Sequence, residues 1–386
     1  MRLIVFGPGY PFRGGIARTT SELARALERE GHEVSFLTPV RQYPAWLYPG
    51  RDDRDPAACP KLECALPVLD PFAPGTWPGA RQAALGWDAD AWVVPYWTWA
   101  WVGLWAYLLR VDRRPPAVAV VHNPVDHEEG ALKRIAAGMV LSRCQALFTH
   151  AEALRLILAA GYPGIPTAAH PLPAVIAGRG IDRARARQAL ALPVEARVAV
   201  FVGLIRPYKG VDVLLEAFAR LPADGTWRLL VAGEPWGELG PALHRQVLRL
   251  GLAERVTLDL RWVAEDELER LLAAADVVVL PYRSGSQSAL APEALARGVP
   301  VVTTRVGGLP EVVQHGVNGL VVAPGAVDEL SAALAGLDDD ALTRLAAGAR
   351  ATGARLSWAG YVAALERLIE QVTCVSTKKP TPGGGL

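Results

Sequence analysis

The sequence predicts an α/β protein with two doubly wound domains, each built on a parallel sheet that helices cover on both faces. Three observations predict it. Short apolar runs alternate with helical stretches in both halves of the chain, which is typical of parallel sheets. The alternation is interrupted around residues 174–193, where an Arg-rich helix (IDRARARQALAL) is expected to act as a bridge. The length of 386 residues exceeds that of one ordinary core and suits two.

The first half carries the expected order of strand and helix. Gly14 and Gly15 open a helix that ends near Gly31. The stretch 41–80 is rich in Pro and charge and is expected to form long loops. Strands are expected at Leu3–Phe6, Val34–Thr38, Ala91–Val94, Ala117–Val121 and Ala146–Thr149.

The second half repeats this order and ends in a further helix. A helix is expected at Val211–Arg220, and another near Trp358–Val372 follows the completed sheet. The last residues, STKKPTPGGGL, have the composition of a flexible tail. Strands are expected at Arg197–Val202, Leu229–Ala232, Val256–Leu258, Val277–Leu280, Val301–Thr303 and Leu320–Val322.

The organisation expected from this pattern is a first domain over 1–178, a second over 179–357 and a tail over 374–386. Doubly wound domains bind ligands at the carboxyl ends of their strands. Where two such domains face each other, the ligand site is expected in the cleft between them.

Composition excludes some classes of function. The chain has 40 basic and 39 acidic residues, a net charge of +1, which argues against a protein that binds duplex nucleic acid. Its four cysteines form no CxxC pair, so reduced cytosolic thiols are expected and a metal site is not. The opening run MRLIVF reaches a Gly-Pro-Gly turn at once and is interpreted as a first strand, not as a signal peptide.

One Trp-rich segment, Trp92–Leu109, has about the length of a membrane-spanning helix. Pro95 interrupts it, and it lies within the strand–helix alternation, so a buried strand, a loop and a core-facing helix are expected. The alternative is a membrane-facing helix, because Trp favours the lipid interface.

The loop Gly203–Gly210 (GLIRPYKG) follows a strand and precedes a helix. Glycines free its backbone, and a helix N-terminus offers unpaired N–H groups to an anion. Arg206 and Lys209 add two cations, which together suit a diphosphate. The alternative is a solvated loop with two incidental basic residues.

A second polar loop follows the expected strand at Val277–Leu280. Gln287, Ser288 and the following N–H groups could bind an anion or hydroxyls at the start of a helix. Glu293 lies about one turn inside, where a carboxylate can accept two hydrogen bonds from a ribose diol. The alternative is a first-turn Glu that the helix dipole favours.

Several segments together resemble the retaining glycosyltransferases of family 4. GLIRPYKGVDVLLEAF and PEALARGVPVVTTRVGGLPEVVQHGVNGLVV look like the donor-binding domain of that family, and GPGYPFRGGIAR resembles its acceptor-side glycine loop. VHNPVDHEE, THAEAL and AHPLP resemble further segments of one branch. The resemblance covers most of the chain and is most specific over residues 281–322.

This resemblance implies the GT-B architecture, with two facing Rossmann-like domains and a last helix, about 358–373, that crosses back to the first domain. It implies transfer of a sugar from a nucleoside diphosphate sugar of the UDP or GDP type, without metal or other cofactor, in the cytoplasm. Peripheral contact with the inner membrane face stays an open alternative.

The resemblance also implies residue roles. Arg206 and Lys209 would hold the diphosphate, Gly14 and Gly15 would let the backbone approach phosphate and acceptor, and His122 would sit beside the donor sugar. Arg261–Val263 would meet the base. The implied donor-binding set is Glu293, Gln287, Ser288, Ala289, Leu290, Val263 and Gly203.

Two positions keep alternatives open. Gly285 stands where the family usually has a first glutamate that helps to orient the donor sugar, and Gln287 or Glu234 could substitute for that carboxylate. His122 could instead be a satisfied polar residue at a sheet edge.

Three rival functions remain. A nicotinamide-dependent dehydrogenase is suggested by Gly7-x-Gly9, but Phe12 occupies the place of the third glycine. A nucleotide-sugar epimerase or a phosphorylase could share the architecture. A non-catalytic sugar-nucleotide-binding or glycan-binding protein would be compatible with Gly285.

Overall fold

A computed structural model of the chain describes residues 1–43, 53–55, 62–111, 113–123, 131–175, 180–223 and 226–376. These residues form two compact units. The first holds the described residues up to Pro171 together with the helix that begins at Trp358, and the second holds Leu172–Ser357. The expected boundary after residue 178 lies outside the described residues, and the division falls before it, between Pro171 and Leu172.

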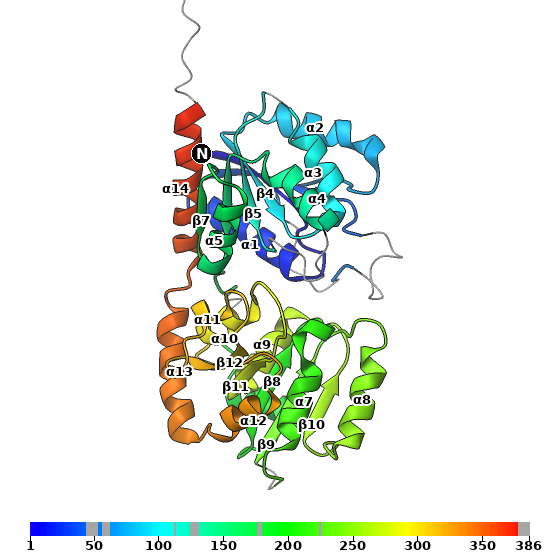
Figure 1. Cartoon of the computed structure of the whole chain (residues 1–386), viewed down its shortest axis with the longest axis vertical. Coiled ribbons are helices and arrows are strands. Elements are labelled where there is room, and N and C mark those ends of the chain that lie inside the picture. The colour runs from blue at the N-terminus through cyan, green and yellow to red at the C-terminus, as the bar shows by residue number, and fades with distance from the viewer. Residues whose placement is uncertain are drawn as a thin grey trace, which may run out of the picture. The chain divides into compact units, whose positions relative to one another are not determined.

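The first unit is a seven-stranded sheet in the order β3-β2-β1-β4-β5-β6-β7, with every neighbouring pair parallel. Helices lie on both faces of the sheet (Figure 1), and all five expected strands are present. Its elements up to residue 171 are β1 (Arg2–Phe6), α1 (Gly15–Arg29), β2 (Glu33–Pro39), β3 (Ala65–Leu69), η1 (Pro74–Thr76), α2 (Trp77–Gly86), β4 (Ala91–Tyr96), η2 (Trp99–Trp101), α3 (Val102–Leu108), β5 (Ala117–Val121), α4 (Ala131–Leu141), β6 (Ala146–Thr149), α5 (Glu152–Gly161) and β7 (Thr167–Ala169).

The expectation of long loops over residues 41–80 is wrong in its second half, because β3, η1 and the start of α2 lie there. Strand β3 contains Pro67, which usually argues against a strand. It is the edge strand of the sheet, however, and an edge tolerates a residue that cannot donate to the ladder. The short strand β7 at the opposite edge was not expected either.

The Trp-rich segment folds as strand β4, the short helix η2 and helix α3, as its interpretation as a core segment predicts. Trp92, Trp101 and Trp105 are fully buried. The rings of Trp92 and Trp105 pack against Phe6, with ring centres 5.2 Å and 6.0 Å from that of Phe6, and Trp101 packs against Trp105 at 5.3 Å. Within the described ranges, no helix is long and apolar enough to cross a membrane.

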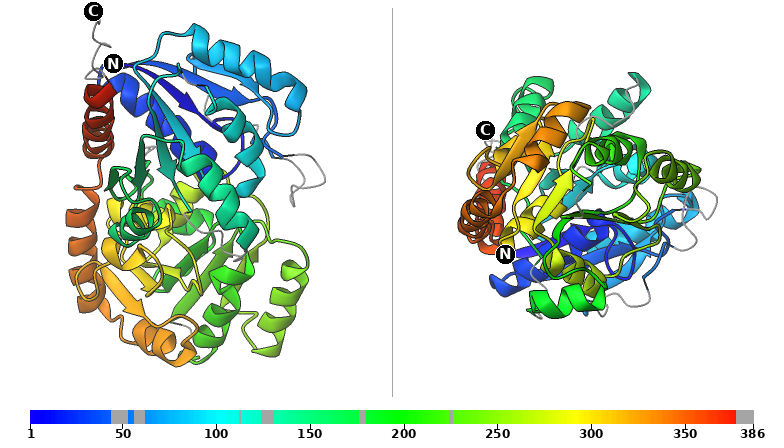
Figure 2. Two further views of the ribbon diagram at one scale, coloured as in Figure 1. Left: turned by 45° about the horizontal axis from the view of Figure 1, so that its top comes forward. Right: turned by 90° about the horizontal axis from the view of Figure 1, so that it is seen from below.

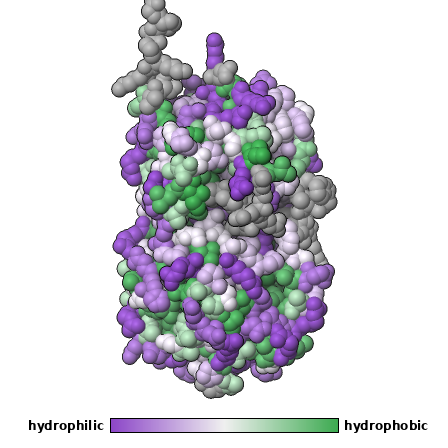
Figure 3. Space-filling model, viewed as in Figure 1, coloured by the Kyte–Doolittle hydropathy of each residue, from purple (hydrophilic) through white to green (hydrophobic). Residues whose placement is uncertain are grey.

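Helices α4 and α5, which follow β5 and β6, carry exposed hydrophobic side chains. On α4 these are Leu132, Ile135 and Met139, and on α5 they are Leu156 and Ile157. Figure 3 shows hydrophobic side chains on the face of the first unit that carries these helices.

The second unit is a six-stranded parallel sheet in the order β10-β9-β8-β11-β12-β13, again with helices on both faces (Figure 2). All six expected strands are present. Its elements are α6 (Arg183–Ala189), β8 (Arg197–Val202), η3 (Pro207–Lys209), α7 (Val211–Ala219), β9 (Trp227–Ala232), α8 (Leu239–Arg249), β10 (Val256–Asp259), α9 (Glu265–Ala274), β11 (Val277–Leu280), α10 (Leu290–Ala296), β12 (Val301–Thr304), α11 (Leu309–Val312), β13 (Gly319–Val322), α12 (Val327–Ala335) and α13 (Asp339–Gly353).

The last helix, α14 (Trp358–Ser376), belongs to the first unit. It packs on α1, β6 and β7, which come from the beginning and the end of that unit's sheet region. Tyr361 is fully buried there, with its ring centre 5.0 Å from that of Phe148. The helix runs to Ser376, past the expected end at residue 373, and the rest of the expected tail lies outside the described residues.

Candidate functional site

The two polar loops that the sequence singles out lie at one place in the second sheet. The chain proceeds from β8 to β9 and β10 in one direction across the sheet, and from β11 to β12 and β13 in the other. Strands β8 and β11 are neighbours, so their carboxyl ends flank the point where the strand order reverses. Open α/β sheets bind ligands in the crevice at this point. The loops that follow β8 and β11 contain Arg206, Lys209, Gln287 and Ser288.

Glycines allow these loops to approach one another closely. Gly203 has φ 126° and Gly210 has φ 68°, both in the region that favours glycine. A Cβ on Gly210 would lie 2.1 Å from the carbonyl oxygen of Pro281, the residue that follows β11. A Cβ on Gly233 would lie 2.0 Å from the carbonyl oxygen of Gly203. The ends of β8, β9 and β11 can therefore meet only because these positions lack a side chain.

Arg206 and Lys209 face aromatic rings instead of carboxylates. The Arg206 guanidinium carbon lies 4.0 Å from the ring centre of Trp236, and the Lys209 Nζ lies 5.5 Å from that of Tyr282. Among the residues that the structure describes, neither cation forms an ion pair. Burial lowers the pKa of Lys209 from its usual 10.5, and the charge of Arg206 lowers it further. The loop therefore holds positive charge that the described residues do not neutralise.

A third cation beside them is neutralised. Arg283 forms two hydrogen bonds with the carboxylate of Asp212, of 2.7 and 2.5 Å. Its backbone N–H donates to the Tyr208 carbonyl at 2.6 Å, and its guanidinium donates to the Pro207 carbonyl at 3.0 Å. Arg283 therefore connects the loop after β11 to the loop after β8, and the Asp212 carboxylate neutralises its charge.

The loop that follows β11 leads into α10 through residues that are partly buried. The Ser288 hydroxyl accepts from the Leu290 N–H at 3.2 Å and lies 3.2 Å from the Tyr282 hydroxyl. Burial raises the pKa of Tyr282 to about 12, so this hydroxyl stays protonated at neutral pH. Gln287 and Ala289 lie on either side of Ser288, and the side chain of Gln287 has no hydrogen-bond partner within the described part of the chain.

Glu293 is only 1% exposed, and both of its carboxylate oxygens already have partners. One accepts from the Val175 N–H at 2.6 Å, and the other accepts from the Arg297 guanidinium at 2.6 Å. A carboxylate oxygen can accept a second hydrogen bond, so these contacts leave acceptor sites. Arg297, four residues after Glu293, is a partner that the sequence spacing could have indicated.

Three further residues lie in the loops that follow β9 and β10: Glu234, Arg261 and Val263. Val263 is partly buried and packs against the core of the second unit. Arg261, two residues before it, is paired with Asp259 at 3.0 Å and Glu267 at 2.7 Å. Glu234 follows β9, and its carbonyl accepts from the Ile205 N–H at 2.9 Å, one residue before Arg206. One carboxylate oxygen of Glu234 is buried without a hydrogen-bond partner among the described residues.

In the first unit, His122 comes directly after β5 and is 4% exposed. Its Nδ1 lies 3.1 Å from Nε2 of His150, which comes directly after the neighbouring strand β6. The other ring nitrogen of His150 lies 3.5 Å from the Tyr361 hydroxyl. Burial lowers the pKa of His122 to about 4, so the imidazole is neutral at pH 7. Both interpretations of His122 stay predictions, and the sequence analysis did not indicate the contacts of His150 with His122 and with Tyr361.

Gly14 and Gly15 lie at the start of α1, in the loop that follows β1. Strands β1 and β4 flank the switch point of the first sheet. Gly14 has φ 115°, and a Cβ built on either glycine meets no atom within 4 Å. The backbone at these two residues is therefore open.

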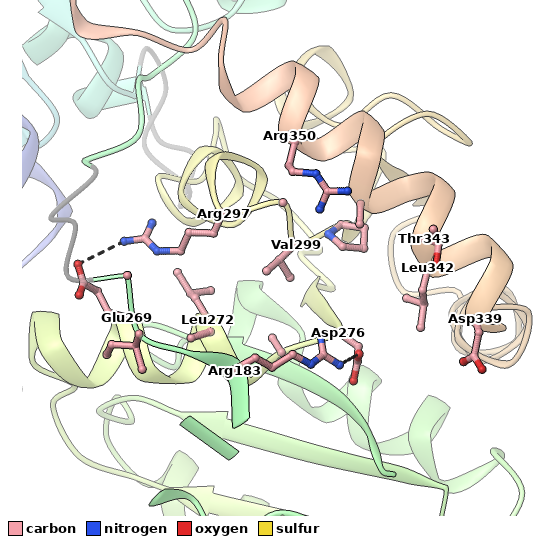
Figure 4. A pocket seen from close by; sticks show the side chains of 17 residues that line it. Arg183, Glu269, Leu272, Asp276, Arg297, Val299, Asp339, Leu342, Thr343 and Arg350 are labelled. Atoms are coloured by element: carbon pink, nitrogen blue, oxygen red, sulfur yellow. Dashed lines mark hydrogen bonds and ion pairs between the residues drawn. The ribbon is translucent and has the colours of Figure 1, made fainter. Parts of the chain in front are cut away.

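A cavity of about 650 Å³ lies at the opposite, amino-terminal edge of the second sheet. Figure 4 shows Arg350 reaching over it from α13, Arg297 directed toward Glu269, and Arg183 paired with Asp276, which directly precedes β11. None of the expected site residues lines this cavity. Among the described residues, Arg297 links the cavity to the candidate site, because it contacts Glu293 on one side and Glu269, at 3.6 Å, on the other.

The described residues do not gather into a metal site. No group of three or more His, Cys, Asp or Glu side chains is found among them. Burial also raises the pKa of Cys64 and of Cys144 to about 12, which disfavours the thiolate that a metal requires. Cys59 lies outside the described residues.

Two family models match the chain, one in each unit. The model of the family described as Glycosyltransferase Family 4 matches residues 13–176, and the model described as Glycosyl transferases group 1 matches residues 196–340. A D-inositol 3-phosphate glycosyltransferase of Mycobacterium marinum (strain ATCC BAA-535 / M) is 43% identical over 159 residues, which are 40% of this chain and 33% of that protein. The chain thus matches about a third of the length of such curated relatives.

Solved structures resemble the whole chain. Sucrose-phosphate synthase of Thermosynechococcus elongatus has a TM-score of 0.79 at 19% identity, over 97% of this chain and 100% of that one. Anabaena HepE in complex with UDP-glucose has a TM-score of 0.73 at 20% identity, over 98% of this chain and 100% of that one. At this level of identity the likeness shows the fold, which is GT-B.

Proposed function

Because the chain belongs to glycosyltransferase family 4, we propose that it transfers a sugar from a nucleoside diphosphate sugar to an acceptor hydroxyl with retention of anomeric configuration. The single observation that carries the proposal is the pair Arg206 and Lys209 at the switch point of the second sheet, without a carboxylate partner among the described residues. An anion with two charged groups is the ligand that complements them.

The diphosphate is proposed to bind at this pair, and departure of the nucleoside diphosphate is the step that fixed positive charge accelerates most. Tyr282 and Trp236 hold the two cations over their rings. A donor phosphate oxygen is proposed to take the proton of the acceptor hydroxyl. Arg206 and Lys209 then supply the charge that a metal ion supplies in other transferases, so we propose a metal-independent reaction.

The remaining site residues keep their expected roles as proposals. Glu293 is proposed to hold the ribose and the loop at Val263 to meet the base. Gly203 and the backbone from Gln287 to Leu290 are proposed to line the phosphates. Glu234 has a buried carboxylate oxygen with no hydrogen-bond partner among the described residues. We therefore favour Glu234 over Gln287 as the residue that replaces the family's first glutamate, whose place Gly285 takes.

From the first unit, Gly14 and Gly15 are proposed for the acceptor side and His122 for the donor sugar. A neutral imidazole with one nitrogen held by His150 offers its other nitrogen for a hydrogen bond to a sugar hydroxyl. The relatives named for D-inositol 3-phosphate suggest phosphorylated polyols as a first class of acceptor to test. A cytoplasmic location is proposed as well.

The first experiment is a thermal-shift screen of the full chain with UDP, GDP and ADP and their glucose or mannose derivatives, with EDTA present. A bound donor raises the melting temperature, because binding to the folded state adds about 2.7 kcal/mol at a ligand concentration of 100 Kd. Arg206→Ala should abolish the shift, whereas Arg249→Ala, which removes an exposed arginine on α8, should retain it. A shift that Arg206→Ala leaves unchanged would refute the proposed site.

The second experiment identifies the reaction. The donor that shifts the melting temperature is incubated with a panel of acceptors, and the anomeric coupling of the product is measured by NMR. An α-linked product from an α-linked donor supports retention. Conversion of the donor without any acceptor would instead indicate an epimerase, and tight binding without any product across the panel would indicate a binding protein.

A further inference from the structure

Three side chains of the first unit form a chain of hydrogen bonds that ends at His122. Tyr361, in the first turn of α14, has its hydroxyl 3.5 Å from Nδ1 of His150. Nε2 of His150 lies 3.1 Å from Nδ1 of His122. We call these three residues the hydrogen-bond chain. At its open end, Nε2 of His122 has no hydrogen-bond partner within the described part of the protein.

Packing keeps water away from the closed end of the hydrogen-bond chain. Tyr361 is fully buried, and the ring centres of Phe148 and Trp358 lie 5.0 Å and 5.4 Å from its own. The cavity that Tyr361 and His122 help to line measures about 10 Å³ and has mostly apolar walls, so it is small for a water molecule. The Tyr361 hydroxyl therefore needs an acceptor from the protein.

The protonation states of the hydrogen-bond chain follow from this burial. Burial raises the pKa of Tyr361 above its usual 10, lowers that of His122 to about 4 and lowers that of His150 well below 6.5. At pH 7 the phenol therefore keeps its proton. Each of the two imidazoles is neutral, with one N–H and one bare nitrogen.

The Tyr361 proton fixes the direction of the hydrogen bonds. Nδ1 of His150 is the acceptor that the described residues offer to this proton, because Nδ1 of the nearby His170 donates to the Pro171 carbonyl at 2.8 Å. If His150 donated to the phenol instead, the phenol proton would be buried without a partner, which costs free energy. Nδ1 of His150 is therefore bare, and its Nε2–H donates to Nδ1 of His122.

We propose that Tyr361 and His150 are positioning residues that hold the proton of His122 on Nε2, so that His122 is a hydrogen-bond donor and not a base. Its complement is a ligand oxygen with a free lone pair, such as that of a sugar hydroxyl. In this tautomer both ring nitrogens of His122 are in use, so His122 does not take the proton of the acceptor hydroxyl. The identity of the ligand rests on the proposed function, whereas the tautomer does not.

The test determines the tautomer of His122 by long-range ¹H–¹⁵N correlation NMR. The full chain is labelled with ¹⁵N-histidine and measured at pH 7 without ligand, and His122→Gln assigns the His122 signals by their loss. A protonated and a bare ring nitrogen have well-separated ¹⁵N shifts, so the tautomer is observed directly. We expect the proton of His122 on Nε2. A proton on Nδ1, or on both nitrogens, would overturn the proposal.

Tyr361→Phe tests the origin of the tautomer, because it removes the hydroxyl and keeps the ring. The ratio of Nε2-protonated to Nδ1-protonated His122 should fall about tenfold, which corresponds to about 1.4 kcal/mol. The two ¹⁵N shifts of the His122 ring should then move toward each other. Trp358→Phe is the matched control, since it alters a ring that packs on Tyr361 without removing a hydroxyl, and it should leave these shifts in place. Unaltered shifts in Tyr361→Phe, with wild-type circular dichroism, would overturn the role of Tyr361.

Addition of a nucleotide-sugar donor separates this proposal from the proposed function. A donor that raises the melting temperature should also shift the resonance of the His122 Nε2 proton, which supports a hydrogen bond to the ligand. The expected tautomer in a chain that binds no donor would refute the proposed function and support the positioning role. A proton on Nδ1 in a chain that transfers sugar would overturn the positioning role and leave the proposed function in place.

Discussion

Replacing Lys209 with methionine should make the protein more stable and less active. Methionine keeps much of the length and apolar surface of the lysine stem but carries no charge. In the protein without ligand, the Lys209 ammonium is partly buried and faces the Tyr282 ring at 5.5 Å, with no carboxylate partner among the described residues. Its charge therefore costs free energy until a ligand neutralises it.

The expected rise in the free energy of unfolding of Lys209→Met follows from two opposing contributions, the cost of burying the ammonium and the attraction between the ammonium and the Tyr282 ring. Taking an ion fully out of water costs several kcal/mol, and a cation–π contact returns about 0.5–1 kcal/mol. Because Lys209 is only partly buried, we expect the free energy of unfolding to rise by about 1–2 kcal/mol. For a unit of this size, that corresponds to a rise in melting temperature of about 2–8 °C.

The pH dependence has a defined sign. Burial lowers the pKa of Lys209 in the folded state below its usual 10.5. Between the folded-state pKa and the unfolded-state pKa of Lys209, the unfolded state binds more protons, so the free energy of unfolding of the wild type rises with pH in that range. The advantage of Lys209→Met should therefore be largest below the folded-state pKa of Lys209 and shrink as the pH rises towards 10.5.

The assay pairs thermal unfolding at several pH values with turnover at saturating donor. Turnover should fall about a hundredfold or more, as it does when a preorganised electrostatic group is removed. Arg283→Met is the matched control, because it removes a neighbouring cation that Asp212 neutralises, and it should lower stability. A Lys209→Met variant that is less stable than the wild type, or that turns over at a near-normal rate, would refute this reasoning.

Three further predictions test other residues of the candidate site: Gly210, Glu293 and His122. Gly210→Ala should lower the free energy of unfolding by at least about 2 kcal/mol in urea denaturation, since φ is 68° and the Cβ would lie 2.1 Å from the Pro281 carbonyl oxygen. Gly31→Ala is the control: φ is 87° but the space around the Cβ is open, so the variant should lower the free energy of unfolding by only about 1 kcal/mol. Glu293→Gln should lower the affinity for the nucleotide, measured by calorimetry. It should also lower the free energy of unfolding by about 2 kcal/mol, because Glu269 is then the one carboxylate partner of Arg297 among the described residues. Unchanged affinity would exclude Glu293 from the ribose site. Burial lowers the pKa of His122 from 6.5 to about 4 in the folded state, so the unfolded state binds the proton first, and the free energy of unfolding falls by at most about 3 kcal/mol as the pH drops from 6.5 to 4. His122→Gln should flatten the plot of the free energy of unfolding against pH in this range. An unaltered plot would contradict the burial of that imidazole.

The alternation of apolar runs and helices was sufficient to predict both sheets, because a buried parallel strand reads as a continuous apolar run. It was insufficient at the edges of the first sheet. Strand β3 contains Pro67 and has a partly exposed pattern, so its sequence looks like a loop until the neighbouring strand β2 is in place. Strand β7 has only three residues and no buried one.

The site could be predicted where its residues are close in sequence and not where they are distant. The order strand, glycine, cation and helix predicted that Arg206 and Lys209 follow the carboxyl end of a strand, because the direction of the chain fixes which end of the strand they follow. That this strand, β8, borders the switch point became known only from the strand order of the sheet. Their aromatic partners, Trp236 and Tyr282, come from the loops after β9 and β11, and no local pattern ties them to the cations. The contact between His150 and Tyr361 joins β6 to the last helix in the same way.

The distribution of partners around the loop after β8 argues for a ligand more strongly than any one residue does. The fold neutralises Arg283 with a carboxylate from the first turn of α7, so a carboxylate can be supplied at this place. It supplies none to Arg206 or Lys209 among the described residues, although Glu234 lies beside Ile205 in the adjoining loop with one oxygen unpartnered. A protein selected only for stability would have paired these charges, since an unneutralised, partly buried cation lowers stability. Two such cations at the switch point of a doubly wound sheet are best explained by an anion that binds there and leaves.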